Sequence, residues 1–189
     1  MAVVDESLID NSHFYTEEYM HSIIKAIDKT TEVIGKCASF IIVPLVLGIA
    51  YDVFMRYVFS KPTFWVYDST YMMYGGYIML GSAYTHLKDN HVRMDLFTSR
   101  LSERKKAILE CVCYIIFFFP LFFILVKYCS EHALWSLSAG ESSSASTWRP
   151  PVYPFKIIIA FGFILFLLQG ISQFIKSLIF VLRGKTAEV

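Results

Sequence analysis

Asp52 and Arg56 are the acidic and basic residues whose spacing most clearly lets them act together. They stand four residues apart in an apolar stretch, so on a helix they share one face and can form an ion pair. Asp68 follows three residues after Trp65, and a cluster of these charges could close a helical hairpin or dock an external partner. A proton or ion path is not indicated, because no acid falls near the middle of an apolar stretch.

The histidines and cysteines could in principle ligate haem or a metal ion. Bis-histidine haem ligation needs two histidines at similar depth on facing helices. We expect His86 at the end of one predicted helix and His132 beyond the far end of the next, so the two cannot reach one iron. Cys111 and Cys113 point to different faces of one helix, so neither a metal set nor a disulfide framework is indicated. The net charge of +1 does not favour nucleic acid. We therefore expect no enzymatic activity and no cofactor.

The elements that carry these residues are unusually apolar. Hydrophobic residues make up 56% of the chain and charged residues 17%, with a mean hydropathy of +0.51. A soluble helical bundle is a poor alternative, because phenylalanines surround Pro120 on every helical face and leave none for water. The sequence predicts an all-α integral membrane protein with four transmembrane helices, near residues 36–58, 64–86, 104–129 and 154–182.

The distribution of lysine and arginine predicts the orientation, since cytoplasmic loops are enriched in both. One side has twelve of the 17 basic residues: Lys25, Lys29, Lys36, Lys88, Arg93, Arg100, Arg104, Lys105, Lys106, Lys176, Arg183 and Lys185. Both termini are therefore predicted to be cytoplasmic, with residues 1–35 as an amino-terminal segment, residues 36–182 as the membrane domain and residues 183–189 as a tail.

The stretch "HLKDNHVRMD" then falls in the internal cytoplasmic loop. Asp95 could cap a short helix over "LFTSRL", and Ser102 could cap the third membrane helix. His91 could bridge the loop to a neighbouring helix end. The other interpretation is a positively charged tether, in which Arg93 serves only orientation.

Two seams could bind other helices, because membrane helices associate through small and polar residues. Ser69, Gly76 and Ala83 recur every seven residues in the second predicted helix. Gln169, Gln173 and Lys176 form a polar stripe on the fourth. Either seam could join this chain's own helices or a partner, and for the polar stripe we favour a partner.

Residues 56–97, "RYVFSKPTFWVYDSTYMMYGGYIMLGSAYTHLKDNHVRMDLF", resemble the DctQ-like small membrane subunit of tripartite ATP-independent periplasmic (TRAP) transporters. The resemblance rests on Arg56-Tyr57, Pro62, Trp65 with Asp68, Leu80-Gly81, His91-Val92 and Asp95, and on "WRPPVYPFK" and "LLQG" further along. One departure is Tyr67, which stands where the family often has the first of two acids.

The resemblance implies a non-enzymatic subunit in the bacterial inner membrane. It would scaffold a large DctM-like subunit that moves a solute, commonly an organic acid, with sodium bound in that large subunit. A DctP-like periplasmic protein would deliver the solute. A membrane anchor for a redox enzyme is the alternative.

From residues and resemblance together we expect the following structural or partner-contact residues: Asp52, Arg56, Trp65, Asp68, Gly76, Gly81, His91, Arg93, Asp95, Gln169, Gln173 and Lys176.

Overall fold

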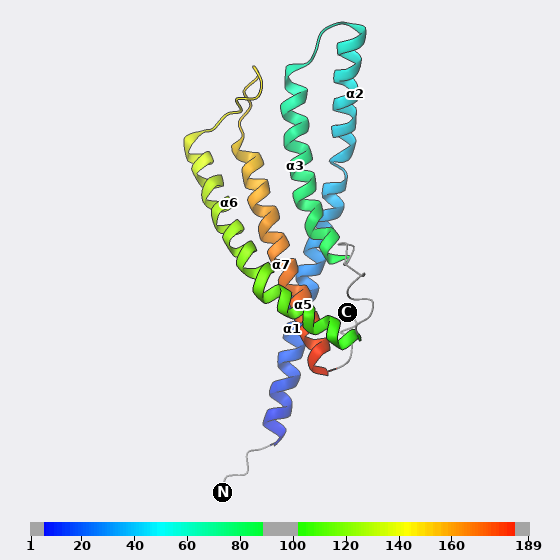
Figure 1. Ribbon diagram of the computed structural model, residues 1–189, viewed down its shortest axis with the longest axis vertical. Coiled ribbons are helices and arrows are strands. Elements are labelled where there is room, and N and C mark those ends of the chain that lie inside the picture. The colour runs from blue at the N-terminus through cyan, green and yellow to red at the C-terminus, as the bar shows by residue number, and fades with distance from the viewer. Residues whose placement is uncertain (1–5, 89–101, 184–189) are drawn as a thin grey trace.

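The computed structural model describes residues 6–88 and 102–183, and every element in these ranges is helical. The elements are α1 (Glu6–Ser39), α2 (Ile42–Val58), α3 (Phe64–Leu87), α5 (Glu103–Cys113), the π-helix η1 (Tyr114–Phe118), α6 (Phe119–Ala139) and α7 (Tyr153–Arg183). Figure 1 shows two hairpins, α2–α3 and α6–α7, that rise in the same direction from a base where α1, α5 and the end of α7 meet. We call the opposite end, with residues 59–63 and 140–152, the loop end.

Three helical stretches are long and apolar enough to cross a membrane: Ser22–Val58, Arg104–Ala139 and Tyr153–Leu182. The predicted all-α fold is therefore confirmed for the described residues. The helix over α3 is not among these stretches, because it holds Asp68 and the moderately polar Tyr67, Tyr71, Tyr74, Tyr77 and Tyr84. The fourth crossing and the cytoplasmic termini stay predictions.

The first predicted helix differs from the structure at its start. Helical backbone begins at Glu6 instead of residue 36, and it breaks between Ser39 and Ile42. Pro44 explains the break, because it has no N–H to donate to the Phe40 carbonyl. The chain tightens there instead, and Phe40 N–H donates to Cys37 O at 3.2 Å while Ile41 N–H donates to Ala38 O at 3.0 Å.

The third predicted helix continues to Ala139, well past residue 129, and Gly140 ends it in the left-handed conformation (φ 60°). His132 thus lies within α6 rather than beyond the helix. The helix is interrupted by the wide turn η1, where Phe119 N–H donates to Tyr114 O five residues back. Pro120 favours this turn, since it cannot supply the α-helical bond that the Ile116 carbonyl needs.

Close contacts among α1, α3 and α7 depend on glycine. A Cβ on Gly162 of α7 would lie 2.9 Å from Met79 Cβ, and one on Gly35 of α1 would lie 2.4 Å from Tyr84 Cβ. Gly76 is buried, and a Cβ placed on it would lie 3.4 Å from Ile158 Cγ2, at van der Waals distance. The small-residue seam of α3 therefore packs against this chain's own α7 at this point. Gly81 is different, since a Cβ there would meet nothing within 4 Å.

Candidate functional site

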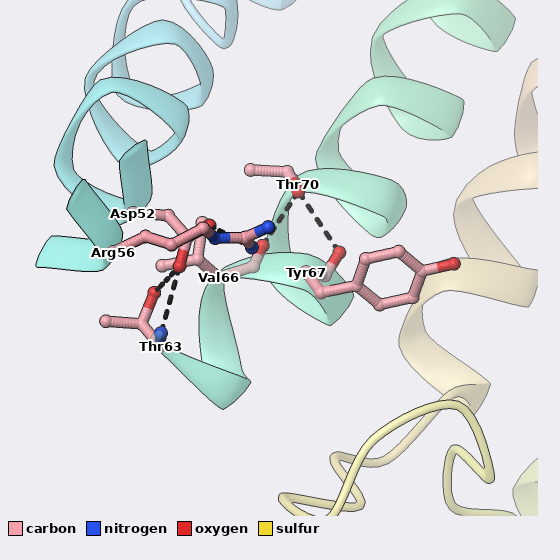
Figure 2. Close-up of polar contacts among 6 residues, drawn as sticks. All are labelled: Asp52, Arg56, Thr63, Val66, Tyr67 and Thr70. Atoms are coloured by element: carbon pink, nitrogen blue, oxygen red, sulfur yellow. Dashed lines mark hydrogen bonds and ion pairs between the residues drawn. The ribbon is translucent and has the colours of Figure 1, made fainter. Parts of the chain in front are cut away.

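Asp52 closes the α2–α3 hairpin at the loop end. Its carboxylate accepts hydrogen bonds from Arg56 Nη2 at 2.8 Å and from the Thr63 backbone N–H at 2.9 Å, and the Thr63 hydroxyl also donates to it. Thr63 stands just before α3, so a side chain of α2 supplies the acceptor that an N-terminal helix residue needs. The predicted Asp52–Arg56 pair is confirmed, and Figure 2 shows Arg56 folded back over Asp52.

Asp68 does not join this cluster, which corrects the predicted three-charge arrangement. Its side chain is 1% exposed, and the Ser143 hydroxyl donates to Oδ1 at 2.9 Å while the Ser146 hydroxyl donates to Oδ2. Both serines belong to the loop between α6 and α7. Asp68 therefore links the two hairpins, whereas Asp52 acts within one of them. Trp65 stands apart, half-exposed with its ring 6.2 Å from that of Tyr51.

The loop between α6 and α7 is closed on itself. Ser143 N–H donates to Pro150 O at 2.8 Å, and Val152 N–H donates to Glu141 O at 2.9 Å. The hydroxyl of Ser146, which also holds Asp68, accepts from Trp148 N–H at 3.2 Å. The loop is thus stabilised by its own backbone and by α3.

Glu141, at the start of this loop, is paired with Lys156 at the start of α7. The hydrogen bond from the Lys156 ammonium holds the pKa of the Glu141 carboxyl below its ordinary value of 4.5. This pair joins the two stems of the loop.

A cleft of about 810 Å³ lies between the α2–α3 turn and this loop. Its lining includes Arg56, Thr63, Tyr67, Ser146, Thr147 and Arg149. Figure 2 shows the Tyr67 ring extending away from the Asp52 cluster. The Asp52 network therefore fixes Arg56 on one wall of the cleft, and the Asp68 network fixes Ser146 on the other.

At the base, Asp28 of α1 gathers the polar stripe of α7. Its carboxylate accepts from Gln169 Nε2 at 2.9 Å, from the Ser172 hydroxyl at 2.8 Å and from Lys176 Nζ at 2.5 Å. Gln169 is fully buried, so its side chain is not available to a partner. Gln173 Nε2 donates to the carbonyls of His86 and Leu87 on α3, at 3.3 and 3.4 Å. Our expectation that this stripe faces a partner is wrong.

Sequence reasoning missed Asp28, although a signal was present. Ile24, Thr31, Gly35 and Ala38 are apolar, small or weakly polar and stand in line with Asp28 at alternating spacings of four and three, and the structure buries all four. That pattern is typical of a helix that packs along one stripe. It places α1 in the bundle, where we had expected only a terminal segment.

Three candidate residues, His91, Arg93 and Asp95, lie outside the described residues together with the short helix predicted over "LFTSRL". Ser102 takes the predicted position before α5 (φ −65°, ψ 150°), but its side chain makes no capping hydrogen bond. The docking role of this loop stays a prediction.

The histidines of α3 and α6 have separate surroundings. His86 Nε2 lies 3.1 Å from the Tyr114 hydroxyl, and its ring stacks on Phe166 with centroids 5.0 Å apart. His132 is exposed and its ring lies 5.9 Å from that of Trp135. Within the described ranges, no group of three His, Cys, Asp or Glu side chains could hold a metal ion.

Comparison with known proteins gives one positive result. Residues 45–179 match the family described as "Tripartite ATP-independent periplasmic transporters, DctQ component". A search of curated proteins and a search of solved structures returned no match. The matched region covers most of α2, all of α3 and α6, and α7 almost to its end. With its long apolar helices, the chain is an integral membrane protein that belongs to the DctQ family, a transporter component and not an enzyme.

Proposed function

We propose that this chain is the small permease subunit of a sodium-coupled uptake system for an organic acid or a related solute, delivered by a DctP-like periplasmic protein. It spans the bacterial inner membrane four times, with both termini in the cytoplasm and the loop end in the periplasm. Sodium binds in the large DctM-like subunit, and this subunit contributes no cofactor. Its own task is to scaffold the large subunit.

The outward face of α3 is the observation that carries the scaffold role. Its residues recur at spacings of four and three, which places them in one stripe along the helix. The stripe consists of Tyr67, Tyr71, Tyr74, Ile78 and Gly81. The four larger side chains are exposed, and Gly81 has open space where a side chain would be.

Tyr74 makes lipid a poor neighbour for this stripe. At 1.5 Å per residue it lies about 15 Å from the start of α3, near the middle of a hydrocarbon core about 30 Å thick. Its side chain is 55% exposed, and a phenol hydroxyl at that depth has no water to bond. A protein neighbour can supply a partner for the hydroxyl, and Gly81 lets a second helix approach closely.

The same stripe supports α3 as the fourth crossing. With 24 residues, α3 is about 36 Å long, which is enough to span the core. Its low hydropathy comes mainly from its five tyrosines, three of which a partner would cover, and Asp68 is its one acidic residue. Four crossings put both termini on one side, and the excess of basic residues marks that side as cytoplasmic.

The redox-anchor alternative has no support from the family match, since DctQ is a transporter component. The surroundings of the histidines offer it no support either. His86 is the last-turn histidine of α3, engaged with Tyr114, and His132 belongs to the other hairpin.

Co-purification with the large subunit tests the scaffold role. Gly81→Leu should lower recovery of the complex several-fold, because a large side chain would hold the second helix away. Ala50→Leu is the matched control, since Ala50 is an exposed small residue on α2. Equal recovery for both variants would remove the α3 stripe as the contact.

Topology has a separate test. A reporter that is active only in the cytoplasm should give signal when fused to either terminus and none when placed after Ser143. Signal at the internal position would reverse the orientation or change the number of crossings.

A further inference from the structure

We propose that the cleft at the loop end is a carboxylate-binding site, suited to a carboxylate carried on an apolar stem. Arg56 and Arg149 line the cleft together with aromatic residues, Phe64 and Tyr67, and the hydroxyl residues Ser144 and Thr147. The inference rests on the proposed function only in placing this end on the side from which solutes arrive. Tyr67 belongs both to the cleft lining and to the α3 stripe, but Arg56 and Arg149 lie outside the stripe, so the complex with the large subunit does not depend on carboxylate binding.

Arg56 is prepared to bind an anion. One of its nitrogens, Nη2, is fixed by Asp52, which is held in turn by Thr63 on the next helix. The side chain is nevertheless 59% exposed, and a guanidinium has five N–H donors. Because its position is already fixed, little side-chain entropy is left to lose on binding a second carboxylate.

Arg149 is the second arginine of the cleft lining. It forms no ion pair with any residue in the described ranges. Its backbone has φ 49°, an unfavourable conformation for a residue that has a side chain and precedes a proline. The bond from Ser143 N–H to Pro150 O keeps the backbone closed beside it. Such strain is often kept where it positions a functional side chain.

The charge balance favours a monoanion. Asp52 neutralises Arg56, and the buried Asp68 already accepts the hydroxyl of Ser146, another lining residue. The two arginines and the two aspartates balance, but Asp68 is buried behind the lining with its carboxylate bonded by two serine hydroxyls, so Arg149 is the lining cation that has no carboxylate from the described residues beside it. A single carboxylate can pair with Arg149, whereas the second charge of a phosphate dianion would have no unpaired lining cation to meet and would be repelled by both aspartates.

The aromatic residues specify the rest of the ligand. Phe64 is exposed, and the Tyr67 ring extends away from Asp52 in Figure 2. These apolar surfaces are suited to a short hydrocarbon stem, while the arginine forks bind the carboxylate oxygens in a bidentate manner. A free organic acid and a glutamate side chain on a soluble protein present the same chemistry.

Ligand-observed NMR on the full chain in phosphatidylcholine nanodiscs tests the site. Butyrate should show saturable contact and butyramide none. Arg149→Gln should weaken butyrate binding about tenfold, and Arg149→Lys should weaken it less. Lys61→Gln is the control, because Lys61 is an exposed cation of the α2–α3 turn, at the same end of the bundle, that does not line the cleft. It should change binding less than twofold.

A short peptide with one exposed glutamate, compared with its glutamine counterpart, separates the two sources. Saturable binding of butyrate supports the site with a free acid as ligand, and binding of the glutamate peptide alone supports it with a protein side chain as ligand. The proposal is overturned if neither binds, if Lys61→Gln weakens binding as much as Arg149→Gln, or if inorganic phosphate displaces the ligand at equal concentration. Co-purification of Arg149→Gln with the large subunit should stay normal, so a failure here is distinct from a failure of the scaffold role.

Discussion

Asp28 and Asp68 perform the same task at opposite ends of the bundle with different partners. Asp28 at the base is 19% exposed and has a cation, Lys176, beside two neutral donors. Asp68 at the loop end is 1% exposed, and the donors found for it are two serine hydroxyls of a loop. Asp28 therefore fastens two helices to each other through an ion pair, whereas Asp68 fastens α3 to a loop segment that helical packing does not hold.

The difference suggests a division of labour. Removing one member of a partly buried ion pair leaves the other charge without compensation, so the base should resist change most strongly. At the loop end the donors to Asp68 are neutral hydroxyls, so breaking one of these bonds leaves no cation without its partner. The loop end can thus adjust around a ligand while the base keeps the helices in place.

Asp28→Ala should have the largest effect on stability. It leaves Lys176 unpaired and Gln169 and Ser172 without their acceptor, and we expect a loss of about 2–3 kcal/mol in the free energy of unfolding, moderated by partial exposure. Unfolding in mixed micelles with increasing SDS measures it. Lys29→Ala, an exposed change on the same helix, should stay within about 0.5 kcal/mol. Equal losses of unfolding free energy in the two variants would contradict the proposal that the bonds of Asp28 hold the base together.

Asp68→Ala should have the second largest effect. Two serine hydroxyls lose a buried acceptor, and we expect a loss of about 1–2 kcal/mol. Amide hydrogen exchange should accelerate in residues 142–151 more than at the base. Glu131→Ala, an exposed acid on α6, is the control. If Asp68→Ala lowers the free energy of unfolding more than Asp28→Ala does, the loop end and not the base contributes more to stability.

Asp52→Ala should cost about 1 kcal/mol, because the Thr63 N–H loses its acceptor as a helix-capping donor does. Arg56→Ala should cost less, since it removes only a largely exposed ion pair. Exchange of the Thr63 amide distinguishes the two variants. If Arg56→Ala proves the more damaging, the charge pair rather than the backbone bond closes the hairpin.

The smallest effect should come from pH. Because the pKa of Glu141 is lower in the folded protein than its ordinary value of 4.5, the pair with Lys156 contributes its full stability above that value. The contribution is lost as pH falls through the lowered folded pKa. Carbon-detected NMR titration of the Glu141 carboxyl should show the low midpoint, and Lys156→Gln should raise it. An unchanged midpoint in that variant would show that the pair does not hold the loop stems.

The sequence predicted what local spacing determines. Asp52 and Arg56 are four residues apart, so their pairing follows from helix geometry alone. The seven-residue repeat of α3 likewise predicted a packed seam, and Gly76 and Ala83 are buried in it. What failed depended on partners distant in the sequence.

Asp28 bonds to residues more than 140 positions away, and Asp68 to residues more than 70 positions away. No local pattern links them. The serine-rich stretch after Glu141 could have suggested donors for a buried acid, and the line of small and apolar residues through Asp28 on α1 could have suggested a bundle helix. The polar stripe on α7 was recognised, but its partner was another helix of the same chain.

The wide turn η1 sets the helical phase of everything that follows it. A turn closed by bonds between residues five apart holds about one residue more than an α-helical turn, which rotates the later residues by about 100° about the helix axis. Ala107 and Cys111 before the turn are buried, as are Ala133 and Ser136 after it. The turn accommodates one residue more than a regular α-helix would hold at this place. Deleting one residue within 114–118 should therefore return the helix to regular winding with both flanking stretches still facing α7, whereas regular winding with every residue kept would turn the residues after 118 by about 100° away from it.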